Sequence, residues 1–325
     1  MKLKKFLIVS LITLGMLLMN ACSNPIGLSV NVSKGDSYKY HIEVSQTNRF
    51  ELLGQNSTTK QDAIMDLDIT VDDIEPNGDI TMSYKYETLN VEIDADGVKS
   101  IISTDDGDSD DPMAMLYNGM VGKGFKVKMS KNGEVKDIIG VNDLLDSMID
   151  SIANSIDIEE DMQPFLSDMR ENLKEILGDE VLRESISQST SALPDVGDVK
   201  IGDSWTVKDE LQTFMPMELE TTYTLEKIED GFAHISVKSE QRIQSADPIN
   251  MFGIDMVPDL VSNTTGDVKI NVKNGFLSEG EMEQKLTGKM TISMLGMEDL
   301  EDFDMGDMEL PMETVTKTVY SITKN

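Results

Sequence analysis

Apolar and polar residues alternate over most of the first half of the chain. Tyr38, Tyr40 and Ile42 share one parity, with polar residues between them. A period of two residues is typical of a strand that buries one face, and turn sequences such as Asp96-Gly97 favour hairpins. The pattern predicts antiparallel strands near residues 38–44, 64–71, 80–86, 89–93, 98–102, 125–129 and 135–139.

The period changes to that of a helix after residue 140. Leu144, Leu145, Met148 and Ile152 fall on one helical face behind Asn142, a suitable N-cap residue. A second apolar stripe begins near residue 162 and ends at Gly178, and a shorter helix starts at Asp179. These segments predict a helical insert at residues 141–193.

Strand patterns return in the second half, near residues 204–207, 220–228, 233–238, 268–272, 280–292 and 314–323. Two segments there match segments of the first half, in the same order. Residues 35–38 match residues 202–205, and residues 126–133 match residues 268–275. A duplicated β-unit explains both matches, and chance similarity between hairpins is the alternative.

Together the patterns predict an α+β protein with two curved antiparallel β-sheets, built on this duplicated β-unit, and a helical insert. By analogy, curved sheets around amphipathic helices are comparable to the half-barrels of lipoprotein lipid carriers that helices close. The expected divisions are a leader, a short tether, a first β-unit, the helical insert and a second β-unit, at residues 1–21, 22–34, 35–140, 141–193 and 194–325.

The leader has the composition of a secretory signal peptide. Lys2, Lys4 and Lys5 precede an uncharged apolar run at residues 6–19. As a helix this run would span about 21 Å, less than the roughly 30 Å hydrocarbon core of a bilayer, so an uncleaved membrane anchor is the weaker alternative. Residues 18–22 resemble the lipobox of bacterial lipoproteins. The resemblance implies cleavage between Ala21 and Cys22 and a lipid on the Cys22 thiol, at the extracytoplasmic face of the cell membrane.

Three further segments resemble a family of uncharacterised bacterial lipoproteins. They are the hairpin at residues 125–139 with its Lys131-Asn132-Gly133 turn, the Leu193-Pro194 segment and residues 201–205. The resemblance implies a lipobox-anchored, β-rich protein built around a domain of unknown function. It brings no catalytic residues, because the shared positions are turns and strand starts.

Acidic residues outnumber basic ones by 60 to 28 and give the chain a net charge of −32. Such a surface repels nucleic acids and anionic lipid headgroups, which excludes binding to either by charge. The expected partners are the membrane through the lipid on Cys22, an apolar ligand, or cationic or calcium-bridged components of the cell envelope. Solubility alone is the simpler explanation of the charge.

The chain has two histidines, His41 and His234, and both lie in alternating strand patterns. Neither belongs to an HExxH zinc motif, and the sequence has no Gly-x-Ser-x-Gly element for a nucleophilic serine. Cys22 is the one cysteine, so lipidation leaves no thiol for redox or metal chemistry. We therefore expect a protein that is not an enzyme. A hydrolase that uses His41 or His234 with a serine and a carboxylate is the weaker alternative.

No cofactor is required by these patterns, and Ca²⁺ is the one candidate. Alternating carboxylates can present several hard oxygens to Ca²⁺. In an EF-hand numbering that starts at Asp106, however, the twelfth position is Tyr117 and not the usual glutamate. A solvated acidic loop is the alternative to a calcium site formed by Asp106, Asp108, Asp110 and Asp111.

Methionine is unusually frequent, with 23 residues, and several lie on the helical stripes. Flexible thioether side chains suit irregular apolar surfaces such as ligand grooves. Ordinary core packing is the alternative for the candidate ligand-binding residues, which are Met148, Ile152, Met162, Phe165 and Met169. The leading hypothesis is a lipid-anchored, non-enzymatic extracytoplasmic protein that binds an apolar ligand or an envelope component. Its rival is an acidic, calcium-dependent surface or adhesive module.

Overall fold

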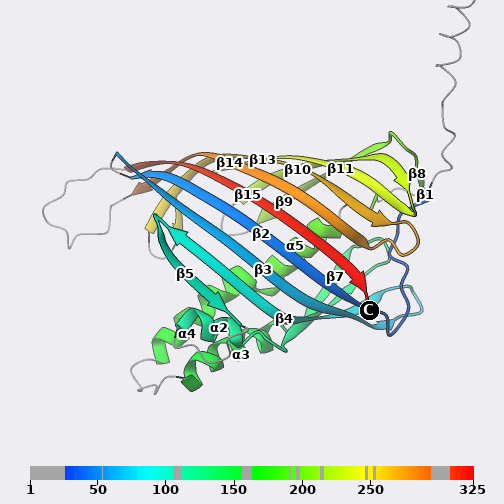
Figure 1. Cartoon of the computed structure of the whole chain (residues 1–325), viewed down its shortest axis with the longest axis horizontal. Helices are drawn as coiled ribbons and strands as arrows, with labels where there is room; N and C mark the ends of the chain where they lie inside the picture. Colours follow the sequence, from blue (N-terminus) through cyan, green and yellow to red (C-terminus); the bar gives the residue numbers. More distant parts are fainter. Residues whose placement is uncertain are drawn as a thin grey trace, which may run out of the picture.

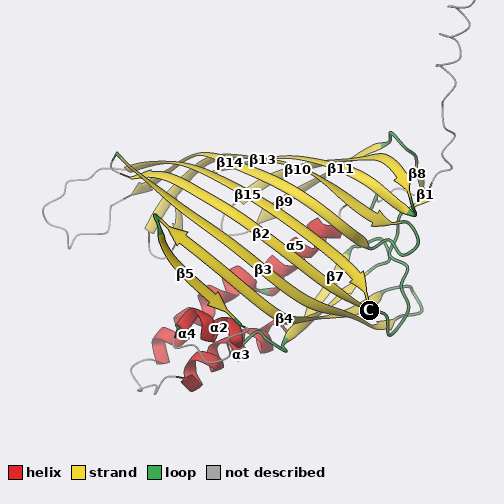
Figure 2. Ribbon diagram, viewed as in Figure 1, coloured by secondary structure: helices red, strands yellow, loops and turns green. Residues whose placement is uncertain are grey.

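One antiparallel β-sheet of 13 strands forms most of the molecule (Figures 1 and 2). The computed structural model describes residues 26–52, 54–104, 111–155, 163–190, 192–194, 198–212, 216–245, 248–251, 254–293 and 308–325. The main path across the sheet runs in the order β7 (Val135–Ile139), β6 (Gly124–Met129), β4 (Ile80–Ala95), β3 (Gln55–Ile74), β2 (Ser37–Leu52), β15 (Met308–Lys324), β14 (Leu277–Ser293), β13 (Ile254–Asn271), β11 (Phe232–Gln244), β10 (Pro216–Glu229) and β9 (Ser204–Gln212). Beside this path, β5 (Val98–Ser103) pairs with β4 and β12 (Ile249–Met251) pairs with β13. A separate two-stranded sheet consists of β1 (Ile26–Gly27) and β8 (Asp198–Val199).

The prediction of an α+β fold with two curved sheets is wrong. Strand β15 is hydrogen-bonded to β14 on one side and to β2 on the other, so strands from both halves of the chain belong to one sheet. This pairing places Met312 opposite Phe50, and local sequence patterns do not encode a pairing between such distant segments. The protein is mostly β, with its helices on one side of the 13-stranded sheet (Figure 2).

The sheet arches over the helices and therefore has an inner and an outer face (Figure 1). Leu67, Ile69 and Val71 of β3 are buried on the inner face, whereas Asp66 and Asp68 belong to the outer face. Successive side chains of a strand point to opposite faces, so the alternation seen in the sequence makes the inner face apolar and the outer face polar. The hydrophobic core consequently lies beneath the arch.

The described helices are α2 (Pro112–Asn118), α3 (Val141–Ser155), α4 (Gln163–Leu177) and α5 (Asp179–Thr190). Leu144, Leu145 and Met148 of α3 are at most 1% exposed and belong to the same apolar core as the inner face of the sheet. Their helical spacing presents one continuous apolar face. The position of α5 beneath the arch matters most for the site, because α5 lies opposite the inner face of the central strands (Figure 1).

The Gly-Asp turns that precede β2 and β9 make the same backbone hydrogen bonds. Gly35 N–H donates to Val71 O at 2.8 Å, and Gly202 N–H donates to Leu225 O at 2.7 Å. In each case the strand residue donates back to the carbonyl oxygen of the neighbouring aspartate, at 2.9 and 3.0 Å. Both glycines have positive φ, 86° and 92°, a conformation that glycine adopts without steric cost. Residues 35–38 and 202–205 therefore resemble each other in structure as well as in sequence.

A proline in β15 tests the single sheet. Lys317 lies on the outer face in the middle of β15, between β14 and β2, with an exposed side chain. Lys317→Pro removes a ladder hydrogen bond from a central strand and leaves its carbonyl acceptor without a partner, so we expect the free energy of unfolding in urea to fall by about 1–3 kcal/mol or more. Lys317→Ala is the matched control, because it keeps the N–H group and loses only an exposed ion pair worth about 1 kcal/mol or less. An equal decrease in the free energy of unfolding of the two variants would contradict the central position of β15.

Candidate functional site

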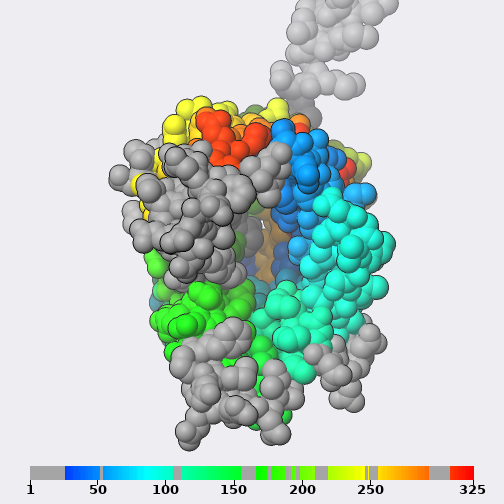
Figure 3. Space-filling view, turned by 90° about the vertical axis from the view of Figure 1, so that its left-hand side faces the viewer, coloured from blue at the N-terminus to red at the C-terminus, as the bar shows by residue number. Residues whose placement is uncertain are grey.

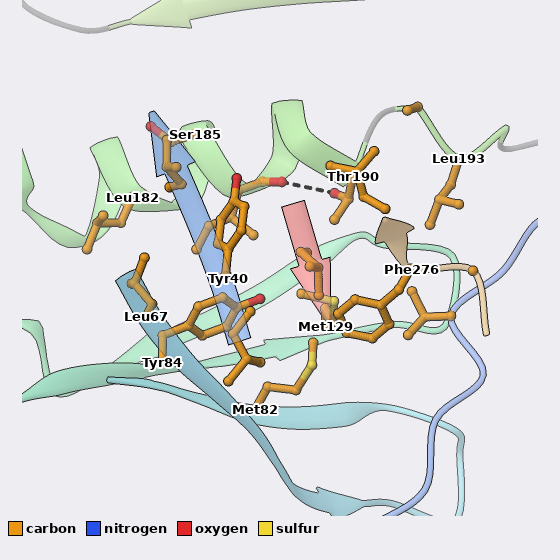
Figure 4. A pocket seen from close by; sticks show the side chains of 18 of the residues that line it. Tyr40, Leu67, Met82, Tyr84, Met129, Leu182, Ser185, Thr190, Leu193 and Phe276 are labelled. Carbon is orange, nitrogen blue, oxygen red and sulfur yellow. Dashed lines mark hydrogen bonds between the residues drawn. The ribbon is translucent and has the colours of Figure 1, made fainter. Parts of the chain in front are cut away.

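An apolar cavity of about 270 Å³ lies between the inner face of the sheet and helix α5 (Figure 4). Residues of β2, β3, β4, β6 and β15 line the sheet wall, namely Tyr40, Ile42, Met65, Leu67, Ile69, Met82, Tyr84, Phe125, Met129 and Ile322. The opposite wall consists of Leu182, Ser185, Ile186 and Thr190 of α5, together with Ala192 and Leu193. The lining is completed by Val30, Ile270 of β13, Leu277 of β14 and the turn residues Gly275 and Phe276.

Strand alternation and register produce the sheet wall. Tyr40 and Ile42 have the same parity on β2 and pair with Leu67 and Met65 of β3. Residues that pair across antiparallel strands share a face, so all four side chains project inward. On the other side, Leu182 and Ile186 are four residues apart and lie on one face of α5. The cavity therefore forms where two regular apolar surfaces meet.

The end of α5 is fixed to the turn between β6 and β7. Thr190 Oγ1 lies within hydrogen-bond distance of Gly133 O, at 2.8 Å, and of Ile186 O, at 3.1 Å (Figure 4). Gly133 has a φ of 88°, and a Cβ at this position would lie 2.8 Å from Thr190 Cβ. A side chain at position 133 would force α5 away from the turn. This contact between Gly133 and Thr190 thus fixes the distance between α5 and the sheet at one end of the cavity.

Aromatic rings form much of the sheet wall, and they are uncharged. Tyr84 stacks on Phe125 with ring centroids 5.4 Å apart, and Tyr40 meets Tyr320 edge-on at 6.3 Å. Burial raises the pKa of Tyr40 to about 12 and also raises the pKa of Tyr84 far above its ordinary value. No Asp, Glu, Lys, Arg or His occurs among the described residues that line the cavity. At physiological pH the lining therefore carries no charge.

The chemistry that this lining supports is the binding of an apolar molecule. Its polar side-chain groups are the hydroxyls of Tyr40, Tyr84, Ser185 and Thr190. Figure 4 shows the Tyr40 hydroxyl directed toward α5. Partly enclosed pockets with aliphatic and aromatic walls favour apolar molecules, which displace water from those walls. A few hydroxyls in such a wall can orient a bound molecule.

Of the five residues predicted to contact a ligand, the three whose side chains the structure describes do not line this cavity. Met148 and Ile152 of α3 are 1% and 4% exposed within the core, and Met169 of α4 is half-buried against it. Met162 and the side chain of Phe165 lie outside the described residues. The predicted residues thus belong to α3 and α4 or the segment between them, whereas the cavity lies at α5.

Sequence reasoning overlooks the residues that do line the cavity. Tyr40 and Ile42 belong to the first alternating pattern in the chain, and Leu182 and Ile186 lie in the shortest of the three helical stripes. These patterns identify side chains that are buried. They do not show where the curvature of the sheet leaves a gap below it.

The acidic run predicted to bind calcium is only partly described. Asp106, Asp108 and Asp110 lie outside the described residues. Asp111 is the N-cap of α2, and its carboxylate accepts a hydrogen bond of 2.8 Å from the Met113 N–H. Within the described part of the chain, no group of three or more His, Cys, Asp or Glu side chains is arranged to hold a metal ion.

Both histidines lie on the outer face of the sheet, away from the cavity. His41 Nδ1 is 2.7 Å from Asp66 Oδ1, and His41 Nε2 is 3.1 Å from Glu43 Oε1. The hydrogen bond with Asp66, followed by the one with Glu43, raises the pKa of His41. His234 is paired with Lys227 on β10 and with Lys269 on β13.

The leader and its lipidation site, Ala21 and Cys22, also lie outside the described residues. Among the helices that are described, none is both long and apolar enough to cross a membrane. Lipidation of Cys22 therefore stays a prediction from the sequence.

The His41–Asp66 pair predicts a pH dependence. Partial burial acts to raise the pKa of Asp66, but hydrogen bonds from His41 and Thr88 lower it overall. The contribution of His41 to stability is complete below its unfolded pKa of about 6.5 and is lost as the pH rises through the raised folded value. The contribution of Asp66 is present above its unfolded pKa of about 3.9 and is lost as the pH falls through the lowered folded value. The pair therefore stabilises the fold most between about pH 4 and 6.5.

We expect Asp66→Asn to lower the His41 titration midpoint, measured from the imidazole proton shifts by NMR. The same variant should lose the added stability between about pH 4 and 6.5. Asp62→Asn removes an exposed carboxylate from the same face of β3 and should leave the His41 midpoint almost unchanged. An unchanged midpoint in Asp66→Asn would contradict the pairing.

Comparisons with solved structures give low similarity. A structure that describes lipid–protein interactions in lipovitellin is 11% identical with a TM-score of 0.44, and the match covers 90% of this chain and 26% of that chain. The translocator domain of the autotransporter NalP from Neisseria meningitidis is 6% identical with a TM-score of 0.32, over 90% of this chain and 89% of that chain. OccK7 from Pseudomonas aeruginosa is 6% identical with a TM-score of 0.26, over 89% and 100% of the two chains. Similarity this low transfers no function.

Sequence comparisons give a family without an activity. No curated protein matches the chain. The model of a family of unknown function, DUF6263, matches residues 77–277. This match spans more than half of the chain, from the turn before β4 to the start of β14. The chain therefore belongs to this family of unknown function.

Proposed function

We propose that this protein is a lipid-anchored, extracytoplasmic, non-enzymatic protein that binds an apolar ligand between α5 and the inner face of the sheet. The observation that carries the proposal is the uncharged apolar cavity of about 270 Å³. Ligand pockets in proteins have volumes of about 300–1,000 Å³ and mostly apolar walls. The cavity is close to the lower end of that range, which suits a single acyl chain or a molecule of similar width.

The cost of an empty cavity supports a ligand role. Protein interiors contain few voids larger than a water molecule. Apolar side chains that line an open pocket lack packing partners on one side and face water instead, which costs free energy. A bound apolar molecule would recover part of it by contact with Tyr40, Leu67 and Leu182.

The proposed location, anchored by a lipid on the extracytoplasmic side of a membrane, rests on the sequence of the leader. A basic start, a short apolar run and Cys22 after a small residue support export and lipidation. A lipid on Cys22 would hold the protein beside a bilayer, whereas the net charge of −32 keeps the folded surface from lying flat on anionic headgroups. An anchored protein with an apolar cavity is suited to take up an apolar molecule from the membrane or the cell envelope.

Filling the cavity tests the ligand site. Ile42 and Met65 are paired half-buried residues of the sheet wall, and a phenylalanine at either position would occupy part of the cavity. We expect Ile42→Phe and Met65→Phe to weaken binding of the neutral probe N-phenyl-1-naphthylamine about tenfold, with an unchanged or higher melting temperature. Fluorescence titration measures the binding. Val319→Phe is the control, because Val319 is 44% exposed and lies on the outer face. Unchanged binding in both cavity variants would contradict the proposal.

Replacing Cys22 tests the anchor. In cells, Cys22→Ser should abolish incorporation of radiolabelled palmitate and reduce the share of protein in the membrane fraction, because serine cannot form the thioether. The control Ser23→Ala changes the next residue and should leave both readouts unchanged. Membrane association without any lipid on the wild-type chain would exclude lipidation at Cys22 as the anchor.

A further inference from the structure

A continuous row of neutral polar side chains crosses the inner face beyond the cavity. We call it the polar row. Its members are paired directly from strand to strand across β10, β11, β13, β14, β15, β2 and β3, and they are Thr221, Ser239, Thr264, Gln284, Thr316, Gln46 and Gln61.

Strand parity places the polar row on the inner face. Gln46 has the parity of Tyr40 and Ile42 on β2, both of which line the cavity. Thr221 has the parity of Tyr223 on β10, and both are buried. Paired residues share a face, so the members between these two ends also point inward.

A second row of polar residues runs beside the first, one inward position further from the cavity. It consists of Gln241, Ser262, Thr314, Asn48 and Thr59, and Leu286 interrupts it. Hydrogen bonds connect the two rows, since Thr314 donates to Asn48 at 2.8 Å and Asn48 donates to Gln46 at 3.3 Å. The inner face therefore carries a band of polar side chains beside the apolar region that lines the cavity, and buried apolar residues such as Leu260 and Ile243 follow beyond the band.

One member of the second row has an unused hydroxyl. Ser262 is 1% exposed, and its Oγ has no hydrogen-bond partner among the described residues. A buried hydroxyl without a partner is destabilising, because it has lost its hydrogen bonds to water and gained none in return. A polar group of a bound molecule beside this row could supply the missing partner.

The two rows contain no charged residue, although 27% of the chain is charged. At the same level of the strands, the outer face carries ionised residues such as Glu283 and Lys317, which form an ion pair of 3.1 Å. An ionic headgroup in a half-enclosed space requires an opposite charge to offset its desolvation. The inner rows offer amide and hydroxyl groups instead, which match an uncharged headgroup with hydroxyls.

The cavity and the polar row are within reach of one amphiphilic molecule. Ile42 lines the cavity, and Gln46 is four residues further along β2, a separation of about 13 Å at about 3.3 Å per residue. The inward side chains between them, such as Val44, Ala63 and Met282, are mostly apolar. Figure 3 views the molecule from the left-hand side of Figure 1, which is the end toward which β2 runs from the cavity. It shows a hollow between strands and helices.

We infer that the ligand is a neutral amphiphile, with an apolar chain in the cavity and an uncharged, hydroxyl-bearing headgroup on the polar row. This inference rests on the proposed function, because it requires that the cavity bind an apolar chain. Acylglycerols and glycolipids share this chemistry. Anionic and cationic lipids do not.

A panel of dodecyl compounds tests headgroup selection on the wild-type protein. Each compound competes with N-phenyl-1-naphthylamine at pH 7.5 below its critical micelle concentration. We expect 1-O-dodecylglycerol or dodecyl glucoside to displace the probe at concentrations about tenfold lower than dodecanoate and dodecyltrimethylammonium, because one or two hydrogen bonds are worth about this much. The better of the two neutral compounds distinguishes a glycerol headgroup from a sugar headgroup.

Variants of the polar row show where the selection arises. Gln46→Leu and Gln284→Leu should each reduce the affinity for the preferred neutral compound about fivefold or more, while the affinity for the headgroup-free probe stays the same. Ser45→Leu is the matched control, because Ser45 precedes Gln46 on β2 and is exposed on the outer face. Circular dichroism shows whether each variant folds. If a variant does not fold, the panel of dodecyl compounds on the wild-type protein still tests whether the site selects an uncharged headgroup.

The outcomes separate this inference from the proposed function. Probe binding with no headgroup preference, or with a preference for a charged compound, overturns the neutral amphiphile and leaves the apolar site intact. A preference that persists in both glutamine variants also overturns the role of the polar row. Absence of probe binding to the wild-type protein overturns both proposals.

Discussion

The hydrogen bonds that β15 makes on both of its edges are the constraint on which the rest of the structure depends. They join β2 to β14 through one strand and so convert the strands of both halves of the chain into a single sheet. A sheet this wide with one apolar face has to curve and be covered to remove that face from water, because backbone twist accumulates across strands and apolar burial drives the closure. The arch, the helices beneath it and the cavity at α5 all follow from this pairing.

The inner face of the sheet carries two kinds of chemistry in a fixed order. Close to α5 it presents tyrosine, methionine and aliphatic side chains, and further along the same strands it presents amides and hydroxyls. The order arises from the register, because Ile42 of β2 pairs with apolar or aromatic residues on β3 and β15, whereas Gln46 and Asn48 pair with polar ones. The contact between Thr190 and Gly133 holds the covering helix at the apolar part. An apolar cavity with a polar band beside it provides a physical basis for recognising both ends of a molecule.

The sequence predicts local elements well and their assembly poorly. The hairpin with the Lys131-Asn132-Gly133 turn appears as β6 and β7, because turn residues and alternation are local signals. The predicted number of sheets is wrong, because the pairing of β15 with β2 depends on contacts between segments far apart in the chain.

The location of the candidate site likewise depends on contacts between distant segments. Periodicity identifies Met148 as a buried residue, which it is, but the gap beside Tyr40 and Leu182 depends on how far α5 lies from the sheet. Gln46 and Gln61 are polar residues at inward strand positions, where the alternation predicts apolar ones. These breaks in the alternation are the sequence signal that the site prediction leaves out.

The place of β15 in the chain has a consequence for assembly. β15 is central in the sheet, yet it follows every other described strand in the sequence. Until it is in place, β2 and β14 each present a long unpaired edge, and such edges readily pair with other chains. Contacts between segments so far apart form slowly because a large loop must close first. A chain that emerges from a translocation channel with its amino end first would thus spend time as two unjoined half-sheets, and its yield would depend on chaperones that shield those edges.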